Sequence, residues 1–282
     1  MKKQFVLGIG AQKAGTSWLS ARLRAEEHYK VGKLTQKELH VWDALEIPEQ
    51  RNCLVRKKLF ASRRHRLLWS MQNTEGFYFD YFSALLQEGG LAADITPSYS
   101  GLSSKTLKNI ESRFAASGID FSAIFIMRDP VSRCVSAFNM NHGRLRAGKS
   151  QEGVLCDDDH DQAFRDYFVS SHATFRTRYE QTLSTMRESF NREQMAVNRE
   201  QMAVFIYETL FSRPEQQRLQ DFLEISDRPD FVKVRSNVAK KKLSLGEEVL
   251  CECAQHFKVT YQAIEKDFPE TRTHWSGWKY LS

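Results

Sequence analysis

Short runs of consecutive apolar residues recur along the chain and predict buried strands. Residues 4–9 (QFVLGI), 121–127 (FSAIFIM) and 203–207 (AVFIY) lack the polar alternation of a half-exposed strand. We therefore expect parallel strands that are buried on both faces. A shorter run at residues 91–94 predicts another strand. Helical stretches separate these runs, which indicates an α/β fold with a central, mainly parallel sheet and helices on both of its faces.

Three helices are predicted in the first half of the chain. One begins near Thr16, one covers residues 49–72, and one covers about residues 103–116. The aromatic segment at residues 77–82 (FYFDYF) is expected to pack inward at the start of a further helix.

Serine and glutamate pairs mark helix starts in the second half. Ser212 with Glu215, and Ser244 with Glu247, have the spacing of a capping box, and the last helix is expected to run to about residue 268. The heptapeptide NREQMAV occurs twice in tandem at residues 191–204. Because seven residues make about two helical turns, we interpret it as a local duplication that lengthens the helix or loop before the next strand.

Composition narrows the class of protein. A chain of 282 residues with 41% hydrophobic residues, only 6 prolines and no linker-like stretch favours a single domain over residues 1–282. The formal net charge of +6 suits an anionic small molecule, an acidic polymer or nucleic acid. No secretory signal and no apolar stretch of the roughly 20 residues that span a bilayer is visible. The five cysteines lack C-x-x-C spacing, so a cytoplasmic protein without zinc or disulfides is expected.

The segment from Gly10 to Ser17 (GAQKAGTS) joins the first predicted strand to the first predicted helix. Its small residues allow backbone N–H groups to approach an oxyanion, and the helix N-terminus adds the positive end of its dipole. Gly10 and Gly15 have the separation found in nucleotide-triphosphate P-loops, but Thr16 stands where that motif needs lysine. Lys13 inside the segment supplies a positive charge instead, so we predict a phosphate site that differs from the Walker motif.

A second candidate anion site follows the strand at residues 121–127. Arg128 comes directly after this strand, at the edge of the sheet where ligands bind in open α/β folds. Asp129 suits the cap of the helix that follows, and Ser136 comes about two turns into that helix. Arg128 and Ser136 can therefore reach one phosphate, with Arg133 nearby. An ion pair at a strand end beside an ordinary helix serine is the alternative.

Two charged segments are less specific. Arginine and lysine are concentrated in residues 56–66, where a solvated helix is the simpler interpretation and a surface for an acidic acceptor is the alternative. Aspartates are concentrated in residues 157–161, where an exposed loop is favoured over a metal site because nothing fixes a ligand geometry.

Together these segments resemble the sulfotransferases that use 3′-phosphoadenosine-5′-phosphosulfate (PAPS), in particular the branch of bacterial and Golgi-type carbohydrate sulfotransferases. QKAGTSW at 12–18 is similar to the family's 5′-phosphosulfate loop, and MRDPVSRCVSAF at 127–138 to its 3′-phosphate motif. Three shorter stretches match in the family's order: KELHVWD at 37–43, DITPSY at 94–99 and IYETL at 206–210.

The resemblance implies a P-loop-like sulfotransferase fold and a role for each matching residue. The residues that would hold the 5′-phosphosulfate are Lys13, Ala14, Gly15, Thr16 and Ser17. The 3′-phosphate would be bound by Arg128 and Ser136. Glu38 matches the catalytic base, and His40 is a second polar group beside it.

The implied reaction is in-line transfer of a sulfuryl group from PAPS to a hydroxyl, or less readily an amine, of a small-molecule or glycan acceptor. Lys13 would stabilise the leaving phosphate of the product PAP, and Glu38 would accept the proton. No metal is expected, because the phosphate is already a good leaving group. Ile95 stands where members that act on sugar chains carry lysine, which argues against a polymeric acceptor. Residues 240–242 (KKK) are a candidate for the family's C-terminal cofactor loop.

Two alternatives come from other classes of protein. A P-loop kinase or NTPase would need a lysine after Gly15 and a Mg²⁺-binding acid at a strand end. A non-enzymatic anion or nucleic-acid binder would use the basic residues at 56–66 and would not depend on Glu38. The resemblance favours the enzyme, with neither nucleic acid nor a membrane as partner, and gives no oligomeric state.

Overall fold

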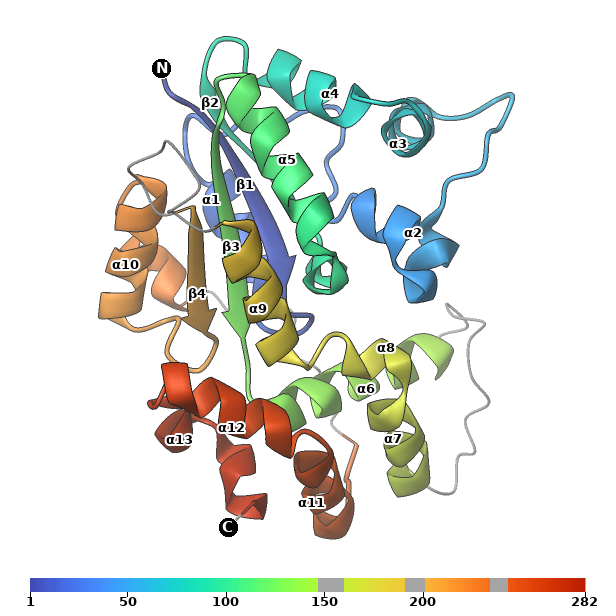
Figure 1. Cartoon of the computed structure of the whole chain (residues 1–282), viewed down its shortest axis with the longest axis vertical. Coiled ribbons are helices and arrows are strands. Elements are labelled where there is room, and N and C mark those ends of the chain that lie inside the picture. Colours follow the sequence, from blue (N-terminus) through green and yellow to red (C-terminus); the bar gives the residue numbers. More distant parts are fainter. Residues whose placement is uncertain (147–159, 191–200, 234–242, 282) are drawn as a thin grey trace.

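The computed structural model describes residues 1–146, 160–190, 201–233 and 243–281 (Figure 1). These residues form a four-stranded parallel sheet in the order β2-β1-β3-β4. The strands are β1 (Lys3–Gly10), β2 (Gly90–Ile95), β3 (Asp120–Met127) and β4 (Met202–Ile206). Each lies within one residue of its predicted bounds, so the expected α/β fold with a parallel sheet is confirmed.

Helices follow the strands in alternation. They are α1 (Thr16–Arg24), α2 (Trp42–Glu46), α3 (Arg63–Asn73), α4 (Phe77–Leu85), α5 (Ser104–Ala116), α6 (Pro130–Arg146), α7 (His160–Val169), α8 (Ser171–Thr174), α9 (Tyr179–Ser189), α10 (Arg213–Leu223), α11 (Glu247–His256), α12 (Lys258–Asp267) and α13 (Thr271–His274). Short 3-10 helices are η1 (Pro48–Cys53), η2 (Pro97–Gly101), η4 (Pro229–Lys233) and η5 (Ser276–Tyr280). In Figure 1, α5 and α9 lie in front of the sheet and α1 lies behind it, so helices cover both faces as predicted.

The core fills the space between the sheet and the helices on both of its faces, and it includes residues of α1 as well as of α5 and α9. Every residue from 4 to 10 in β1 and from 121 to 127 in β3 is buried, which explains the continuous apolar runs of the sequence. The ring of Phe5 stacks on Phe114 of α5 with centroids 4.1 Å apart. The aromatic segment at 77–82 begins α4 and buries three of its rings, as predicted.

The helix predicted at residues 49–72 is wrong in its first half. The 3-10 helix η1 ends at Cys53, and α3 begins only at Arg63. Ser62 caps α3 by accepting a hydrogen bond from the His65 N–H. A helix therefore begins after Ser62, and Ser62 is not a position inside a longer helix. In the non-helical segment between them, Leu59 and Phe60 are 91% and 94% exposed. The basic side chains there lie partly on a loop and not along one solvated helix.

Two predicted capping boxes differ from the structure. Ser212 is the N-cap residue of α10, but its side chain makes no capping hydrogen bond, because a proline in the first turn removes one of the N–H donors. Ser244 is not a cap, since α11 begins at Glu247 after Gly246. The last predicted helix is broken at Phe257, which is 1% exposed and separates α11 from α12.

Several predictions concern residues outside the described parts of the chain. The first copy of the NREQMAV repeat lies there, as do residues 198–200 of the second copy, whose end enters β4 at Met202. The aspartates at 157–159 and the lysines at 240–242 lie outside as well. Asp161 is described: it lies in α7, and its carboxylate accepts a hydrogen bond of 2.9 Å from the Gly246 N–H. None of the described helices has the length and apolar character required to cross a membrane.

Candidate active site

A cavity of about 1070 Å³ opens at the carboxyl edge of the sheet. Residues that follow each of the four strands line it, as expected for a ligand site in an open parallel sheet. Residues of the loop before α2, of α6, of the segment that leads to α11 and of η5 also line the cavity. The polar lining residues are Gln12, Lys13, Thr16, Ser17, Lys37, Glu38, His40, Ser98, Arg128, Ser132, Ser136, Asn139, Arg176, Tyr207, Glu208, Ser244, Ser276, Lys279 and Tyr280.

The phosphate loop (residues 10–17) lies between β1 and α1 at this cavity. Gly15 precedes α1 with a φ of 92°, a left-handed conformation that favours glycine, and a Cβ there would lie 3.2 Å from the Tyr207 ring. Lys13, Gly15, Thr16 and Ser17 line the cavity. Ala14 is fully buried and does not line it, so its side chain packs in the core.

The second predicted anion site reaches the same cavity. Arg128 follows β3, donates a 2.9 Å hydrogen bond to the Lys13 carbonyl, and stacks its guanidinium 4.6 Å from the Tyr207 ring centre. These contacts tie the second site to the phosphate loop. Ser136 lines the cavity from α6. Arg133 does not: it is 0% exposed and its guanidinium contacts Cys134 and the Tyr167 hydroxyl.

Asp129 does not serve as a simple cap of α6. Its carboxylate is buried and accepts hydrogen bonds from Ser132, Tyr261, Ser276 and the Gly277 N–H. The residue therefore fastens the C-terminal segment, which includes η5, to the start of α6. Without that fastening the cavity would lose the wall formed by η5.

The Glu38 loop (residues 37–41) is held by the end of β2 and the turn after it. The Ile95 N–H donates to the Lys37 carbonyl at 3.1 Å. The Leu39 N–H donates to the Thr96 hydroxyl at 3.0 Å, and the Val41 N–H to the Tyr99 hydroxyl at 3.3 Å. This explains why the DITPSY segment and the KELHVWD segment occur together.

Asp94 organises that turn from within the core. It is fully buried and accepts hydrogen bonds from the hydroxyls of Thr96, Tyr99 and Tyr78. Burial raises its pKa from 3.8 to about 6, against the lowering effect of these hydrogen bonds. The acidic residue of the turn is thus structural: it positions the two hydroxyls that hold the Glu38 loop.

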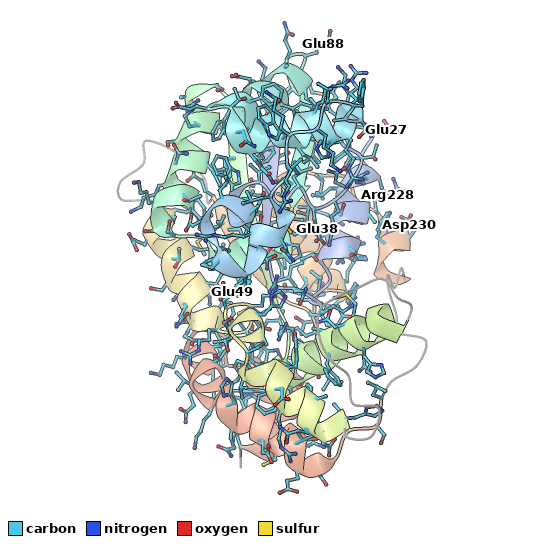
Figure 2. All side chains as sticks on the ribbon, turned by 90° about the vertical axis from the view of Figure 1, so that its right-hand side faces the viewer. Glu27, Glu38, Glu49, Glu88, Arg228 and Asp230 are labelled. Atoms are coloured by element: carbon cyan, nitrogen blue, oxygen red, sulfur yellow. The ribbon has the colours of Figure 1, made fainter. Side chains whose placement is uncertain are left out.

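Three side chains of the loop (Lys37, Glu38 and His40) and Asp43 of α2 form a series of contacts. Lys37 Nζ lies 2.7 Å from Glu38 Oε1, and it donates to the hydroxyls of Thr16 at 3.2 Å and Ser17 at 3.4 Å. His40 Nε2 lies 3.3 Å from Glu38 Oε2. Its Nδ1 lies 2.7 Å from Asp43 Oδ2, which also accepts a hydrogen bond from Ser98. Figure 2 shows Glu38 at mid-height of the molecule, beside α2.

These contacts determine the charge states of Glu38 and His40. Burial disfavours the Glu38 carboxylate, but hydrogen bonds from His40 and Lys37 and their charges outweigh it and lower its pKa from 4.5 to about 2. Burial also disfavours the His40 imidazolium, yet its hydrogen bonds with Asp43, Cys53 and Glu38 raise its pKa from 6.5 to about 12. At neutral pH the site therefore holds an ionised Glu38 between two cations.

The sequence alone gives no role to three residues of the cavity wall, Lys37, Glu208 and Arg176, or to Asp43, which is buried behind His40. Lys37 and Asp43 lie within the matched KELHVWD segment, so the motif itself carried the signal. Glu208 lies in IYETL, accepts a 3.1 Å hydrogen bond from the Asp129 N–H, and has its pKa raised by burial to about 7. Arg176 lies between α8 and α9, where no motif marks it.

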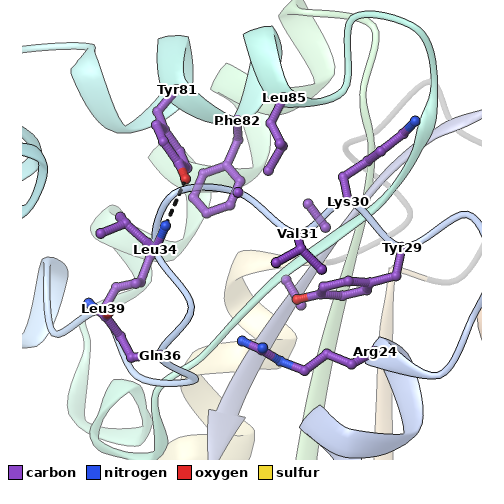
Figure 3. A pocket seen from close by; sticks show the side chains of 13 residues that line it. Arg24, Tyr29, Lys30, Val31, Leu34, Gln36, Leu39, Tyr81, Phe82 and Leu85 are labelled. Carbon is purple, nitrogen blue, oxygen red and sulfur yellow. Dashed lines mark hydrogen bonds between the residues drawn. The ribbon is translucent and has the colours of Figure 1, made fainter. Parts of the chain in front are cut away.

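A second cavity lies between the chain at residues 29–36 and α4 (Figure 3). There the Leu34 N–H donates to the Tyr81 hydroxyl at 3.3 Å. Its volume of about 20 Å³ holds about one water molecule. A substrate therefore belongs in the larger cavity.

Comparisons with known proteins give the family and the fold of the chain. The model of the family described as sulfotransferase domain matches residues 3–249. The fold is similar to the crystal structure of a sulfotransferase from Alicyclobacillus acidocaldarius, with a TM-score of 0.57 and 15% identity over 94% of this chain and 96% of that one. A sulfotransferase domain from the curacin biosynthetic pathway matches with a TM-score of 0.46 and 15% identity over 83% of this chain and 78% of that one.

Curated proteins give no significant match. The family match nevertheless spans most of the chain, and it includes the phosphate loop, the Glu38 loop and Arg128. The protein belongs to the sulfotransferase family.

Proposed function

We propose that the protein transfers a sulfuryl group from PAPS to a hydroxyl of a small acceptor. The observation that carries the proposal is the position of Lys37, whose ammonium contacts both the Glu38 carboxylate and the Thr16 hydroxyl. A candidate base and a candidate phosphate site thus share one cavity, linked by a cation. In-line transfer needs a proton acceptor on one side of the sulfur and positive charge on the other.

We assign the donor to the part of the cavity lined by the phosphate loop and Arg128. Lys13 and the backbone N–H groups at the start of α1 would bind the 5′-phosphosulfate. Arg128, already fixed by the Lys13 carbonyl and the Tyr207 ring, would bind the 3′-phosphate with Ser136. No described cluster of three or more His, Cys, Asp or Glu residues is suited to a metal.

The reaction balances without another reactant. The acceptor oxygen forms a bond to sulfur, the bond from sulfur to the 5′-phosphate oxygen breaks, and the electron pair stays on that phosphate, next to Lys13. The proton of the acceptor passes to Glu38 and then to solvent. Because Glu38 is a weak base with a pKa of about 2, we expect the proton to move late, after the sulfur–oxygen bond has formed.

His40 and Asp43 hold Glu38 in place. Asp43 fixes the imidazole through Nδ1, and the opposite nitrogen faces the Glu38 carboxylate. We propose that His40 is a positioning residue that acts through Glu38. It also stands close enough to the cavity to contact an acceptor hydroxyl directly.

We propose that residues 1–282 form one domain. Ser276, Lys279 and Tyr280 lie beyond the matched residues 3–249 and line the same cavity. We also propose that the protein acts in the cytoplasm, on a small molecule or glycan and without nucleic acid. This part of the proposal rests on the sequence. The buried Ile95 offers no positive charge to a sugar chain.

The function is tested by incubating the full chain with PAPS and a metabolite extract, then searching for sulfated products by mass spectrometry. We expect at least one extract component to gain SO₃ with the wild type and not with Lys13→Ala. The kinase alternative predicts instead a phosphorylated product with ATP and Mg²⁺ and none with PAPS.

A further inference from the structure

Arg176 is a buried cation in the wall of the large cavity. Its side chain is 4% exposed, yet it is among the residues that line the cavity. One guanidinium nitrogen, Nη1, donates to the His172 carbonyl at 2.9 Å, and the guanidinium lies 4.3 Å from the Phe175 ring centre. Its Nε finds no partner. Across the described parts of the chain, no carboxylate forms an ion pair with it.

A second buried arginine adds to the positive charge behind this wall. Arg133 is 0% exposed and contacts a thiol and a phenol rather than a carboxylate. The charges of Arg133 and Arg176 act on one another, and together with burial they lower the pKa of His172 to about 4. His172 is therefore neutral. Arg133 has an acid in contact, because hydrogen bonds from Cys253 and Arg133 and the charge of Arg133 outweigh burial and lower the pKa of the Cys134 thiol to about 6. Arg176 has no acid in contact among the described residues, and a buried cation of this kind costs free energy unless an anion pairs with it.

The surroundings of Arg176 associate it with the turn after β2 and with Asp43. The ring of its neighbour Phe175 packs against Gly101, where a Cβ would lie 2.9 Å from the ring, and Gly101 ends the turn that begins at Pro97. The charge of Asp43, which holds His40 and Ser98, acts on Arg176. Arg176 thus belongs with the side chains around Glu38, where the acceptor is placed.

We propose that Arg176 binds an anionic oxyacid group of the acceptor, so that the acceptor is a hydroxyl compound with a carboxylate or phosphate at a distance from the reacting oxygen. The inference rests on the proposed function, because it places the hydroxyl of that compound at Glu38. The planar guanidinium suits a two-oxygen contact with either group. The negative charge also suits the cation that Arg176 contributes to the cavity wall.

The test measures binding to the full chain saturated with PAP. Calorimetry compares three probe series of increasing chain length: linear hydroxycarboxylates, their methyl esters, and hydroxyalkyl phosphates. We expect a carboxylate or a phosphate to bind the wild type about 10- to 100-fold more tightly than the matching ester, the range for a charge-assisted contact. Preference for carboxylate or for phosphate then identifies the group. Absence of tighter binding by either anion overturns the proposal.

Substitutions of Arg176 test whether this residue causes the preference for an anionic probe. Arg176→Gln is expected to abolish the preference for the anion while PAP affinity stays within about twofold, and Arg176→Lys to retain part of the preference. The control is Arg178→Gln, an exposed arginine two residues away that does not line the cavity. Loss of PAP affinity in a folded Arg176→Gln protein would assign the arginine to the donor and overturn the proposal. If Arg176→Gln does not fold, the comparison of hydroxycarboxylates with their methyl esters on the wild type still decides whether the cavity prefers an anion.

The two proposals fail in different ways. If PAP binds and neither anion is preferred, the inference about Arg176 is wrong and the proposed function stands. If PAP does not bind at all, the proposed function is wrong, and the inference falls with it.

Discussion

The ammonium of Lys37 lies 2.7 Å from a carboxylate oxygen of Glu38, and the same ammonium reaches the first turn of α1. The contact connects residues that are 21 positions apart in the sequence, and together with His40 it keeps Glu38 ionised. A carboxylate in this setting accepts a hydrogen bond from an acceptor hydroxyl without competing for its proton before the reaction begins.

Glu38→Gln should lower kcat by about 10²- to 10⁴-fold, the usual contribution of a positioned base. PAP affinity should change little, because the substitution keeps the shape of the side chain. Steady-state kinetics and calorimetry on the same preparation separate the two effects. An unchanged kcat would exclude Glu38 as the base.

Lys13→Ala should lower kcat by about 10²- to 10³-fold, because it removes positive charge from the leaving phosphate. The matched control is Lys33→Ala, an exposed lysine that does not line the cavity. Near-normal turnover of the Lys13 variant, measured at saturating PAPS, would contradict the leaving-group role.

Arg128→Ala should weaken PAP binding by about 10- to 100-fold, since a charge-assisted phosphate contact is lost. The effect on kcat at saturating PAPS should be smaller. Calorimetry with Arg64→Ala as an exposed control measures the difference. Equal PAP affinity of the Arg128 variant and the wild type would exclude the assigned 3′-phosphate contact.

His40→Gln should destabilise the protein in a manner that depends on pH. The folded pKa of His40 is raised from 6.5 to about 12, so its contribution is complete below pH 6.5 and is lost progressively as the pH rises toward 12. The difference in Tm between wild type and variant should therefore be larger at about pH 6 than at about pH 9. Asp43→Asn should show the same trend. A difference that grows with pH would refute the assignment of a cationic His40.

Much of the fold was predictable because local signals determine it. The continuous apolar runs of β1 and β3 arise from burial on both faces, and a single sequence displays that directly. The false helix at 49–72 arose because its charged residues have good helix propensity, whereas the structure ends η1 at Cys53 and begins α3 at Arg63. The break at Phe257 depends on tertiary packing, which no local pattern displays.

The candidate site also contains residues that local motifs predict and residues whose role depends on tertiary structure. Lys13, Glu38, His40 and Arg128 lie in contiguous motifs, and the structure brings them to one cavity. Arg133 occupies a matching motif position, but the direction of its side chain depends on α7, far away in sequence. Arg176 has no local signal, because its significance comes from burial without an acidic partner.

Binding of PAP to the full chain is the sharpest test of a PAPS-dependent transferase. The full chain is titrated with PAP in buffer without divalent metal, and separately with ATP and Mg²⁺, by isothermal titration calorimetry. We predict saturable binding of one PAP per chain, weakened by Arg128→Ala, with ATP and Mg²⁺ binding more weakly. Tight binding of ATP with Mg²⁺ and none of PAP would contradict this prediction.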